Sequence, residues 1–206
     1  MLVLNNVSFY YKPSKYIIKD LSYRFKPNSF NVICGENGSG KTTLVKLILG
    51  LQKPISGSIE RDPKLSIGYL PDFNGLYGNC TILENIKFRI GLYGMSYNDL
   101  KKNAFYWMKA YNLEESKDTL VRELSMGMKK KTALICACIT RPDILVLDEP
   151  TNSLDVESKQ ELSEMLKDIA KGQTLTICIS HDVDFINAME VSPVYLVNGV
   201  LQHENN

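Results

Sequence analysis

The chain has 206 residues, of which 44% are hydrophobic and 23% charged, and this composition suits one globular domain rather than a disordered protein. A formal net charge of +1 argues against the broad basic surface that binds nucleic acid, so we expect no nucleic-acid partner. The longest apolar run, residues 133–139, is far below the roughly 20 residues of a membrane-spanning helix, so we expect a soluble protein. The five cysteines lack the spacing of a zinc site or a disulfide framework, which favours reduced thiols in the cytosol.

The first third of the chain is predicted to form strands that lead into a glycine-rich turn. Residues 2–11 and 17–25 have strand patterns joined by a Lys-Pro-Ser turn, and residues 29–34 form a third strand. A helix is expected over residues 42–49, where Gly50 stops it. Two short strands, 58–60 and 65–70, then flank a break at Pro63.

The middle of the chain, from about residue 81 to 139, has a helical pattern with few strand signals. Thr81 and Glu84 have the spacing of a capping box, and three consecutive lysines at 129–131 suggest a solvated helix start. Alternation of strand and helix then returns, and this alternation predicts an α/β fold with a parallel core and an inserted helical segment. The expected elements are a strand at 144–147, a helix at 156–170, a strand at 174–179, and a hairpin of strands 194–197 and 200–202 around Asn198-Gly199.

A phosphate-binding loop is the clearest motif. Residues 35–42, Gly-Glu-Asn-Gly-Ser-Gly-Lys-Thr, fit the pattern G-x-x-x-x-G-K-[ST] between a predicted strand and a predicted helix. A glycine-rich turn with an incidental lysine is the alternative, but the full spacing and the strand–helix context favour a site for ATP and Mg²⁺. Lys41 is predicted to reach the β- and γ-phosphates, and the Thr42 hydroxyl to ligate Mg²⁺. The residues expected to contact the nucleotide here are Asn37, Gly38, Ser39, Gly40, Lys41, Thr42 and Thr43.

An apolar strand that ends in two carboxylates is the second motif. Residues 144–149 read Ile-Leu-Val-Leu-Asp-Glu, and a buried strand delivers its carboxyl end to the ligand edge of an open α/β sheet. Asp148 can hold Mg²⁺ there, and Glu149 can polarise a water for attack on the γ-phosphate. The alternative, a surface acidic pair, is less attractive beside a phosphate loop.

Three further strings complete a recognisable set: Leu-Ser-Met-Gly-Met at 124–128, Asn-Ser-Leu-Asp at 152–155, and Ser-His-Asp at 180–182. With the loop and the acidic strand, in this order, they resemble the ATP-binding cassette (ABC) ATPase family, over essentially the whole chain. The resemblance implies a P-loop NTPase fold of class α/β, with a mixed sheet core, an antiparallel β subdomain and an inserted α-helical subdomain. It implies a single domain over 1–206, with 1–71 and 141–206 forming the nucleotide-binding core and 72–140 the helical signature subdomain.

The resemblance also assigns roles to single residues. Ser125 and Gly127 would contact the γ-phosphate bound to the opposite subunit, although a lone Leu-Ser-x-Gly string is more often a helix N-cap. His181 would be the switch histidine that contacts the γ-phosphate, and Asp155 would contact the other subunit or cap the following helix. Tyr11 matches the aromatic residue that stacks on adenine, with Tyr10 as its rival.

Two positions depart from the family's pattern. Asp72 stands where the family usually has a glutamine that ligates Mg²⁺; its carboxylate can still ligate, but it is one methylene shorter and charged. Met126 and Met128 replace the commoner glycine and glutamine of the signature, whereas Gly127 is kept.

The signature string at 124–128, together with residues 69–72, 84–85 and 92–94, is similar to the matching sequences of efflux cassettes, which pair with a separate transmembrane permease subunit. The resemblance therefore implies an ATPase dimer with ATP sandwiched between subunits, peripheral on the cytoplasmic face of the cell membrane, powering export of a peptide, antibiotic, polysaccharide or similar substrate. Two alternatives stay open. One is a non-transport ABC ATPase acting on DNA or ribosomes, which the absence of sustained heptads disfavours. The other is a degenerate nucleotide-binding subunit with little hydrolysis.

Overall fold

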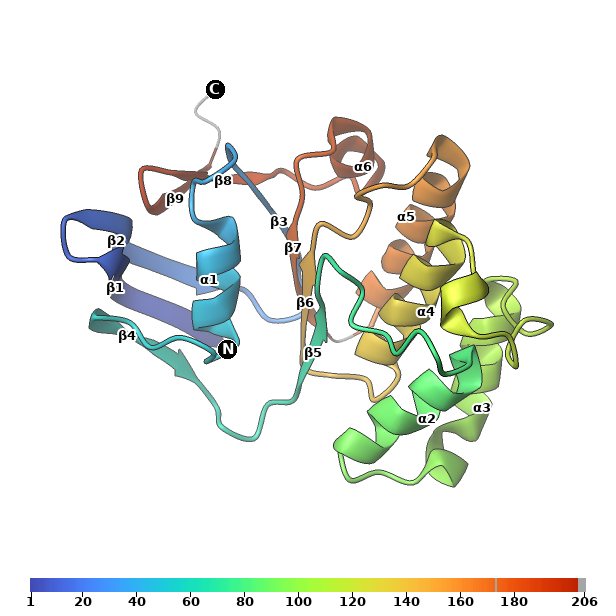
Figure 1. Cartoon of the computed structure of the whole chain (residues 1–206). Coiled ribbons are helices and arrows are strands. Elements are labelled where there is room, and N and C mark those ends of the chain that lie inside the picture. Colours follow the sequence, from blue (N-terminus) through green and yellow to red (C-terminus); the bar gives the residue numbers. More distant parts are fainter. Residues whose placement is uncertain (173, 204–206) are drawn as a thin grey trace.

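Two β-sheets and a lobe of helices make up residues 1–172 and 174–203, the part of the chain that the computed structural model describes (Figure 1). The smaller sheet is antiparallel, with strand order β2-β1-β4. Its strands are β1 (Leu2–Lys12), β2 (Lys15–Phe25) and β4 (Ser56–Arg61). This sheet is the antiparallel β subdomain that the sequence predicts.

The larger sheet has six strands in the order β5-β6-β7-β3-β8-β9. Neighbouring strands are parallel except for β8 and β9, which form an antiparallel hairpin. Every residue of β6 and β7 is buried, which explains why their sequences are mostly apolar, with Thr176 and Asp148 as the exceptions. The strands are β3 (Phe30–Cys34), β5 (Ile67–Leu70), β6 (Ile144–Asp148), β7 (Leu175–Ile179), β8 (Val194–Val197) and β9 (Val200–His203).

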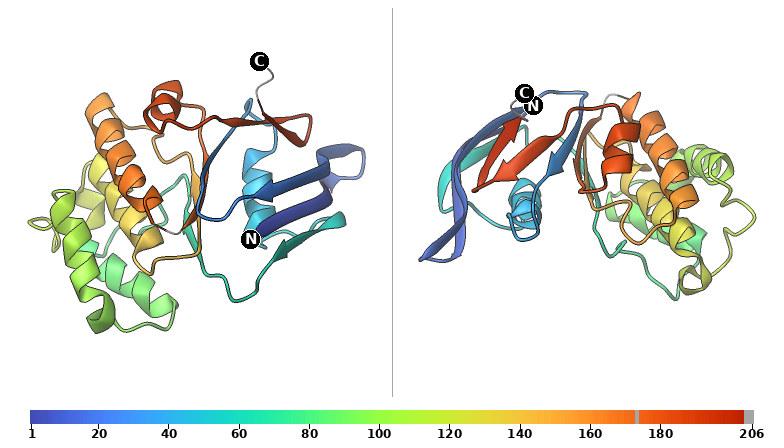
Figure 2. Two further views of the ribbon diagram at one scale, coloured as in Figure 1. Left: turned by 180° about the vertical axis from the view of Figure 1, so that it is seen from behind. Right: turned by 90° about the horizontal axis from the view of Figure 1, so that it is seen from above.

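The larger sheet separates two hydrophobic cores because alternate strand residues face opposite sides. Ile144 and Val146 pack with α1 (Lys41–Ile48) and the smaller sheet, whereas Leu145 and Leu147 pack with the helical lobe. Helix α1 therefore lies between the two sheets, and the other helices lie on the far side of the larger one (Figure 2). These are α2 (Ile82–Leu92), α3 (Tyr97–Ala110), α4 (Met126–Cys138), α5 (Val156–Ala170) and α6 (Val183–Ala188), with a 3₁₀ turn at Val121–Glu123.

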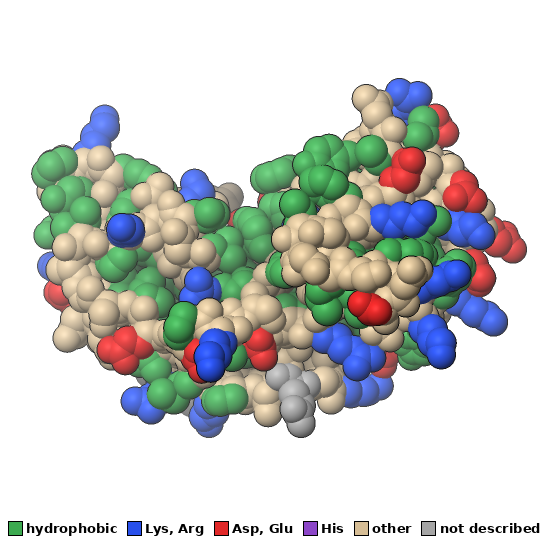
Figure 3. Space-filling view, turned by 90° about the horizontal axis from the view of Figure 1, so that it is seen from below, with side chains coloured by type: hydrophobic (Ala, Val, Ile, Leu, Met, Phe, Trp, Pro, Cys, Tyr) green, Lys and Arg blue, Asp and Glu red, His purple; other side chains and the backbone are tan. Residues whose placement is uncertain are grey.

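Strand β5 approaches α4 unusually closely at Gly68. A Cβ atom at this position would lie 2.0 Å from the Ala137 carbonyl oxygen, so only glycine fits here without displacing the helix. Seen from below, the molecule is hollowed between the β lobe and the helical lobe, with hydrophobic side chains in the hollow (Figure 3). Among the described residues, no helix is both long and apolar enough to cross a membrane.

The structure confirms the predicted fold class and corrects several details. Helix α4 begins at Met126 rather than Lys129, and the short helix α6 was not predicted. The expectation of a solvated lysine run is wrong for two of its three members, because Lys130 is 1% exposed and Lys131 7%. Tertiary packing of α4 against the sheet and α5 buries them, and no local pattern signals that.

Candidate nucleotide-binding site

The glycine-rich loop connects β3 to α1 and leaves the first turn of that helix open. Gly40 caps α1 in the left-handed conformation, with φ 105°, and a Cβ there would lie 2.7 Å from the Ile17 side chain. Since glycine has no side chain to cap the helix, the amide groups of the first turn remain available to an anion. Within residues 1–172 and 174–203, the Ser39 hydroxyl is buried without a hydrogen-bond partner. The loop thus has the donors that a phosphate requires.

Lys41 lies inside this loop. Its Nζ donates to the carbonyl oxygens of Gly35 at 2.7 Å and Glu36 at 3.0 Å, and the residue is only 8% exposed. The loop backbone therefore holds a buried ammonium group beside the start of α1, where it adds positive charge to the helix end.

The acidic pair follows β6. Asp148 is 6% exposed, and burial raises the pKa of its carboxyl; the nearby Glu149 and Asp72 raise it further, while Lys130 and Lys41 oppose the shift. A divalent cation at this carboxylate would lower its pKa again by favouring the charged form. Asp148 is thus a buried carboxyl group whose charged form a metal would favour.

Glu149 is held in a strained position next to His181. Its φ is 49°, in the left-handed region, and its N–H donates to the Ile179 carbonyl at 3.0 Å. The His181 Nδ1 lies 2.9 Å from Glu149 Oε1. A carboxylate oxygen can only accept, so Nδ1 carries the hydrogen in this arrangement, and among residues 1–172 and 174–203 no hydrogen bond engages Nε2. The pair joins the ends of two adjacent strands, β6 and β7.

One cleft of about 460 Å³ brings most of the predicted residues together. Asn152, which sequence reasoning did not single out, lies in its wall and belongs to the string 152–155. The predicted residues that line the cleft are Asn37, Gly38, Gly40, Lys41, Thr42, Thr43, Asp148, Glu149 and His181.

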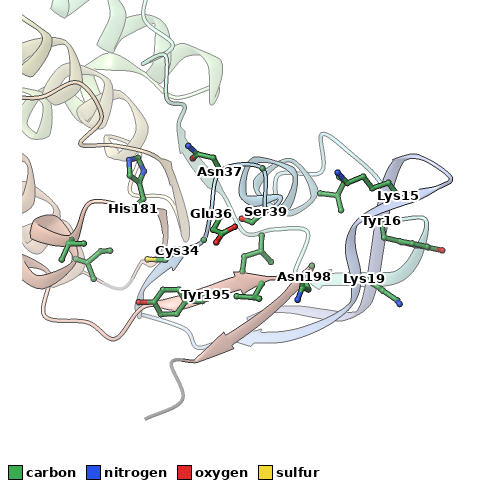
Figure 4. A pocket seen from close by; sticks show the side chains of 18 residues that line it. Lys15, Tyr16, Lys19, Cys34, Glu36, Asn37, Ser39, His181, Tyr195 and Asn198 are labelled. Atoms are coloured by element: carbon green, nitrogen blue, oxygen red, sulfur yellow. The ribbon is translucent and has the colours of Figure 1, made fainter.

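A larger cleft of about 940 Å³ adjoins this one and shares the tip of the loop. Figure 4 shows His181 at one end, Lys15 and Tyr16 at the other, and Glu36 and Ser39 between them. The two clefts together give space for a ligand larger than a phosphate chain.

The predicted adenine-stacking Tyr11 is 56% exposed at the end of β1 and lines neither cleft. It lies two residues after the buried Phe9, and the two ring centroids are 5.0 Å apart. The ring of Tyr10 packs on Tyr16 instead, with the centroids 5.3 Å apart. Tyr16 itself lines the larger cleft and is an aromatic candidate that the sequence analysis missed.

Asp72 follows β5, adjacent to the acidic strand, but it does not line the smaller cleft. Its Oδ1 accepts a hydrogen bond from Asn152 Nδ2 at 3.2 Å, and its carbonyl oxygen accepts one from Lys130 Nζ at 2.9 Å. Its carboxylate is therefore already engaged by the chain.

The signature residues Ser125 and Gly127 lie at the start of α4, outside both clefts. Ser125 is exposed and caps the helix by accepting from Met128 N–H at 3.2 Å. Gly127 packs against α5, where an added Cβ would lie 2.5 Å from Ser158 Oγ. Asp155 caps α5 through Ser158 N–H at 2.8 Å, as its alternative role requires.

The fold and the cleft together define a P-loop ATPase, whose phosphate loop and acidic strand converge at the carboxyl edge of a parallel sheet. The ABC transporter family matches residues 18–152, and the chain belongs to that family. It is the ATP-binding, ATP-hydrolysing subunit of an ABC transporter.

Three similar proteins illustrate the relationship. The zinc import ATP-binding protein ZnuC of Rickettsia conorii is 39% identical over 172 residues, 82% of this chain and 72% of that protein. The ergothioneine transport ATP-binding protein EgtV of Helicobacter pylori is 33% identical over 193 residues, 88% of this chain and 90% of that protein. A dimeric post-hydrolysis structure of the ATP-binding cassette MJ0796, bound to ADP and Pi, superposes with a TM-score of 0.82 at 26% identity, covering 100% of this chain and 98% of that one.

Proposed function

We propose that the smaller cleft binds Mg·ATP with its triphosphate on residues 37–43 and hydrolyses it. The observation that carries this proposal is the convergence of the loop, the buried Asp148 and the Glu149–His181 pair on one cleft. The open first turn of α1 supplies donors for phosphate oxygens. The Ser39 hydroxyl, which has no hydrogen-bond partner among the described residues, lies in the wall of the adjoining larger cleft. The Lys41 ammonium group adds positive charge, and its side chain can rotate from the loop carbonyls towards the β- and γ-phosphates.

The donor set suits Mg²⁺ because it consists of oxygen atoms. The Thr42 hydroxyl and the Asp148 carboxylate line the cleft and would hold the metal. Among the described residues, no cluster of three acidic, histidine or cysteine side chains could form a closed metal cage. That fits Mg²⁺, which usually binds one or two carboxylates and completes its shell with water and phosphates. Asp72, held by Asn152, would reach the metal through water. When bound, Mg²⁺ neutralises charge on the phosphates.

Glu149 is placed to act as the general base. Its carboxylate would take a proton from a water molecule while the water oxygen attacks the γ-phosphorus. The bond between the γ-phosphorus and the bridging oxygen breaks, and ADP leaves with the electron pair. His181 holds Glu149 Oε1 through Nδ1 and presents Nε2 towards the space that the γ-phosphate would occupy.

A second copy of the chain, or a similar subunit, would complete the site. Ser125 is exposed at the start of α4 but lies outside its own cleft, so it is available to a nucleotide bound by another subunit. Hydroxyl and amide groups at a helix start attract phosphate, so the Ser125 hydroxyl and the Gly127 amide would contact it there. The similar cassette MJ0796 forms a dimer, which supports a dimer here.

A separate transmembrane permease would carry the substrate, with this subunit peripheral on its cytoplasmic face. The sequence strings predict export, but the relatives named above are a zinc import protein and an ergothioneine transport protein. They give no support to export, and we therefore propose uptake of a small solute as the direction to test first. The identity of the solute depends on the permease, because this chain binds the nucleotide.

The test compares the wild-type chain with Glu149→Gln. Calorimetry should show Mg·ATP binding to both proteins, since glutamine keeps the size of the side chain. Phosphate release should fall by about 100-fold or more in the variant, the usual contribution of a general base. Wild-type turnover by the variant would remove Glu149 from this role, and absence of nucleotide binding by the folded wild-type chain would refute the proposed site.

A further inference from the structure

Lys130 is a buried lysine whose ammonium bridges two strand ends of the nucleotide site. The residue is 1% exposed, in the second turn of α4. Its Nζ donates to the carbonyl oxygen of Asp72 at 2.9 Å and to that of Glu149 at 3.2 Å. Asp72 follows β5 and Glu149 follows β6, so one side chain from the helical lobe ties the carboxyl ends of two neighbouring strands.

Burying this charge is unfavourable, and the surroundings offset the cost only in part. Burial lowers the pKa of Lys130, while the nearby carboxylates of Asp72, Asp148 and Glu149 act to raise it. The next lysine, Lys131, forms the charged contact between α4 and α5, with its Nζ 3.0 Å from Glu161 Oε2. The Lys130 ammonium contacts loop backbone instead, and that placement points to a role at the site.

Lys130 is one of several groups that fix the backbone of Glu149. The Glu149 N–H is fixed on the Ile179 carbonyl, and its own carbonyl accepts from Asn152 N–H at 3.2 Å as well as from Lys130. Its backbone is in the left-handed region, which a glutamate adopts only when its neighbours enforce it. The direction of the Glu149 side chain towards His181 and the cleft follows from this backbone.

We propose that Lys130 is a positioning residue: its ammonium holds the Glu149 backbone so that the carboxylate faces the attacking water, and it links that position to the Asp72 segment. The proposal rests on the proposed function, in which Glu149 is the base. Movement of the helical lobe or of the loop after β5 would change the distance from Lys130 to both carbonyls. The same contact thus makes the alignment of the base dependent on the position of α4.

The experiment compares Lys130→Met with Lys131→Met in the full chain. Methionine keeps much of the side-chain volume at either position but removes the ammonium. We expect Lys130→Met to bind Mg·ATP with a dissociation constant within about threefold of wild type, while kcat falls about 10- to 100-fold, the size of effect that misplacing a catalytic group produces. Lys131→Met should keep kcat within about twofold, because its partner lies on α5.

A double-mutant cycle separates positioning from a general structural role. In single-turnover measurements, Lys130→Met should cause little further loss in a Glu149→Gln background, because the base that it orients is already absent. Equal losses in both backgrounds would overturn the proposal. So would a wild-type kcat in Lys130→Met.

Two further results keep the test decisive. Should Lys130→Met fail to fold, Lys130→Gln retains one donor for a carbonyl, and we expect it to fold with a smaller loss of kcat, about threefold to tenfold. A wild-type kcat in that variant overturns the proposal. Failure of the proposed function looks different: Glu149→Gln would then hydrolyse ATP at the wild-type rate, whatever Lys130 does.

Discussion

The contact between β5 and α4 makes Gly68→Ala a sharp test of the packing. The added Cβ would lie 2.0 Å from the Ala137 carbonyl oxygen and 2.8 Å from Pro142 Cγ. Both neighbours belong to rigid parts, the end of a buried helix and a proline ring. Gly91 offers a matched control in α2, since nothing lies within 4 Å of its Cβ position.

The expected change in the free energy of unfolding of Gly68→Ala is the difference between two opposing effects. To restore even 3.0 Å from the 2.0 Å contact, α4 and β5 must separate by about 1 Å, and overpacking of this kind costs about 3 kcal/mol when backbone must move. Replacing glycine by alanine also stabilises by about 0.4–1 kcal/mol by restricting the unfolded chain. We therefore expect Gly68→Ala to lower the free energy of unfolding by about 2 kcal/mol. Gly91→Ala should raise it by up to about 1 kcal/mol through helix propensity.

Urea unfolding followed by circular dichroism measures both changes, with calorimetry as a second probe. For a chain of this size, about 2 kcal/mol corresponds to a fall in Tm of about 4–8 °C. An unchanged m value would show that the difference lies in stability rather than in the extent of unfolding. Equal unfolding free energies for Gly68→Ala and Gly91→Ala would refute the reasoning that the 2.0 Å approach is rigid.

Two further predictions concern nucleotide binding and the pH dependence of stability. Tyr11→Ala should weaken ATP binding about tenfold in calorimetry, because loss of one stacked base costs about 1–3 kcal/mol, whereas Tyr10→Ala should leave binding unchanged. Weaker binding in Tyr16→Ala alone would instead assign adenine stacking to Tyr16, which lines the larger cleft. The backbone N–H of Ser66 donates to Asp143 at 2.8 Å, as does its hydroxyl, and these bonds lower the pKa of that carboxyl. A lowered folded-state pKa stabilises the fold above the ordinary aspartate pKa, and this stabilisation is lost as pH falls through the folded value. NMR titration of Ser66→Ala should show the Asp143 pKa moving up towards its ordinary value, and an unmoved pKa would contradict the assignment.

Local patterns predicted the elements of this chain well. The Asn198-Gly199 turn forms the hairpin of β8 and β9, and the loop at residues 35–42 lies between a strand and a helix as expected. These features depend on backbone preferences that a few neighbouring residues fix. The short helix α6 escaped notice because six residues contain too little periodicity to distinguish them from a turn.

The sequence was less informative where distant segments meet. Burial of Lys130 depends on strand ends that come from residues 72 and 149, so its own neighbours in the sequence suggest a solvated side chain. The hydrogen bond between Asp72 and Asn152 likewise joins the segments that follow two adjacent strands, β5 and β6. Motif resemblance placed the residues of the cleft, but it carried no information about how the chain holds them.

The order of strands in the larger sheet affects how the protein matures. Strand β3 leads into the phosphate loop, yet its two neighbours are β7 and β8, which lie far downstream of it in the sequence. Until residues 175–197 leave the ribosome, β3 has neither partner, and the anchor of the loop stays unformed. A chain that ends before β7 therefore contains the entire loop sequence but lacks both strands that flank β3, and we expect it not to bind ATP.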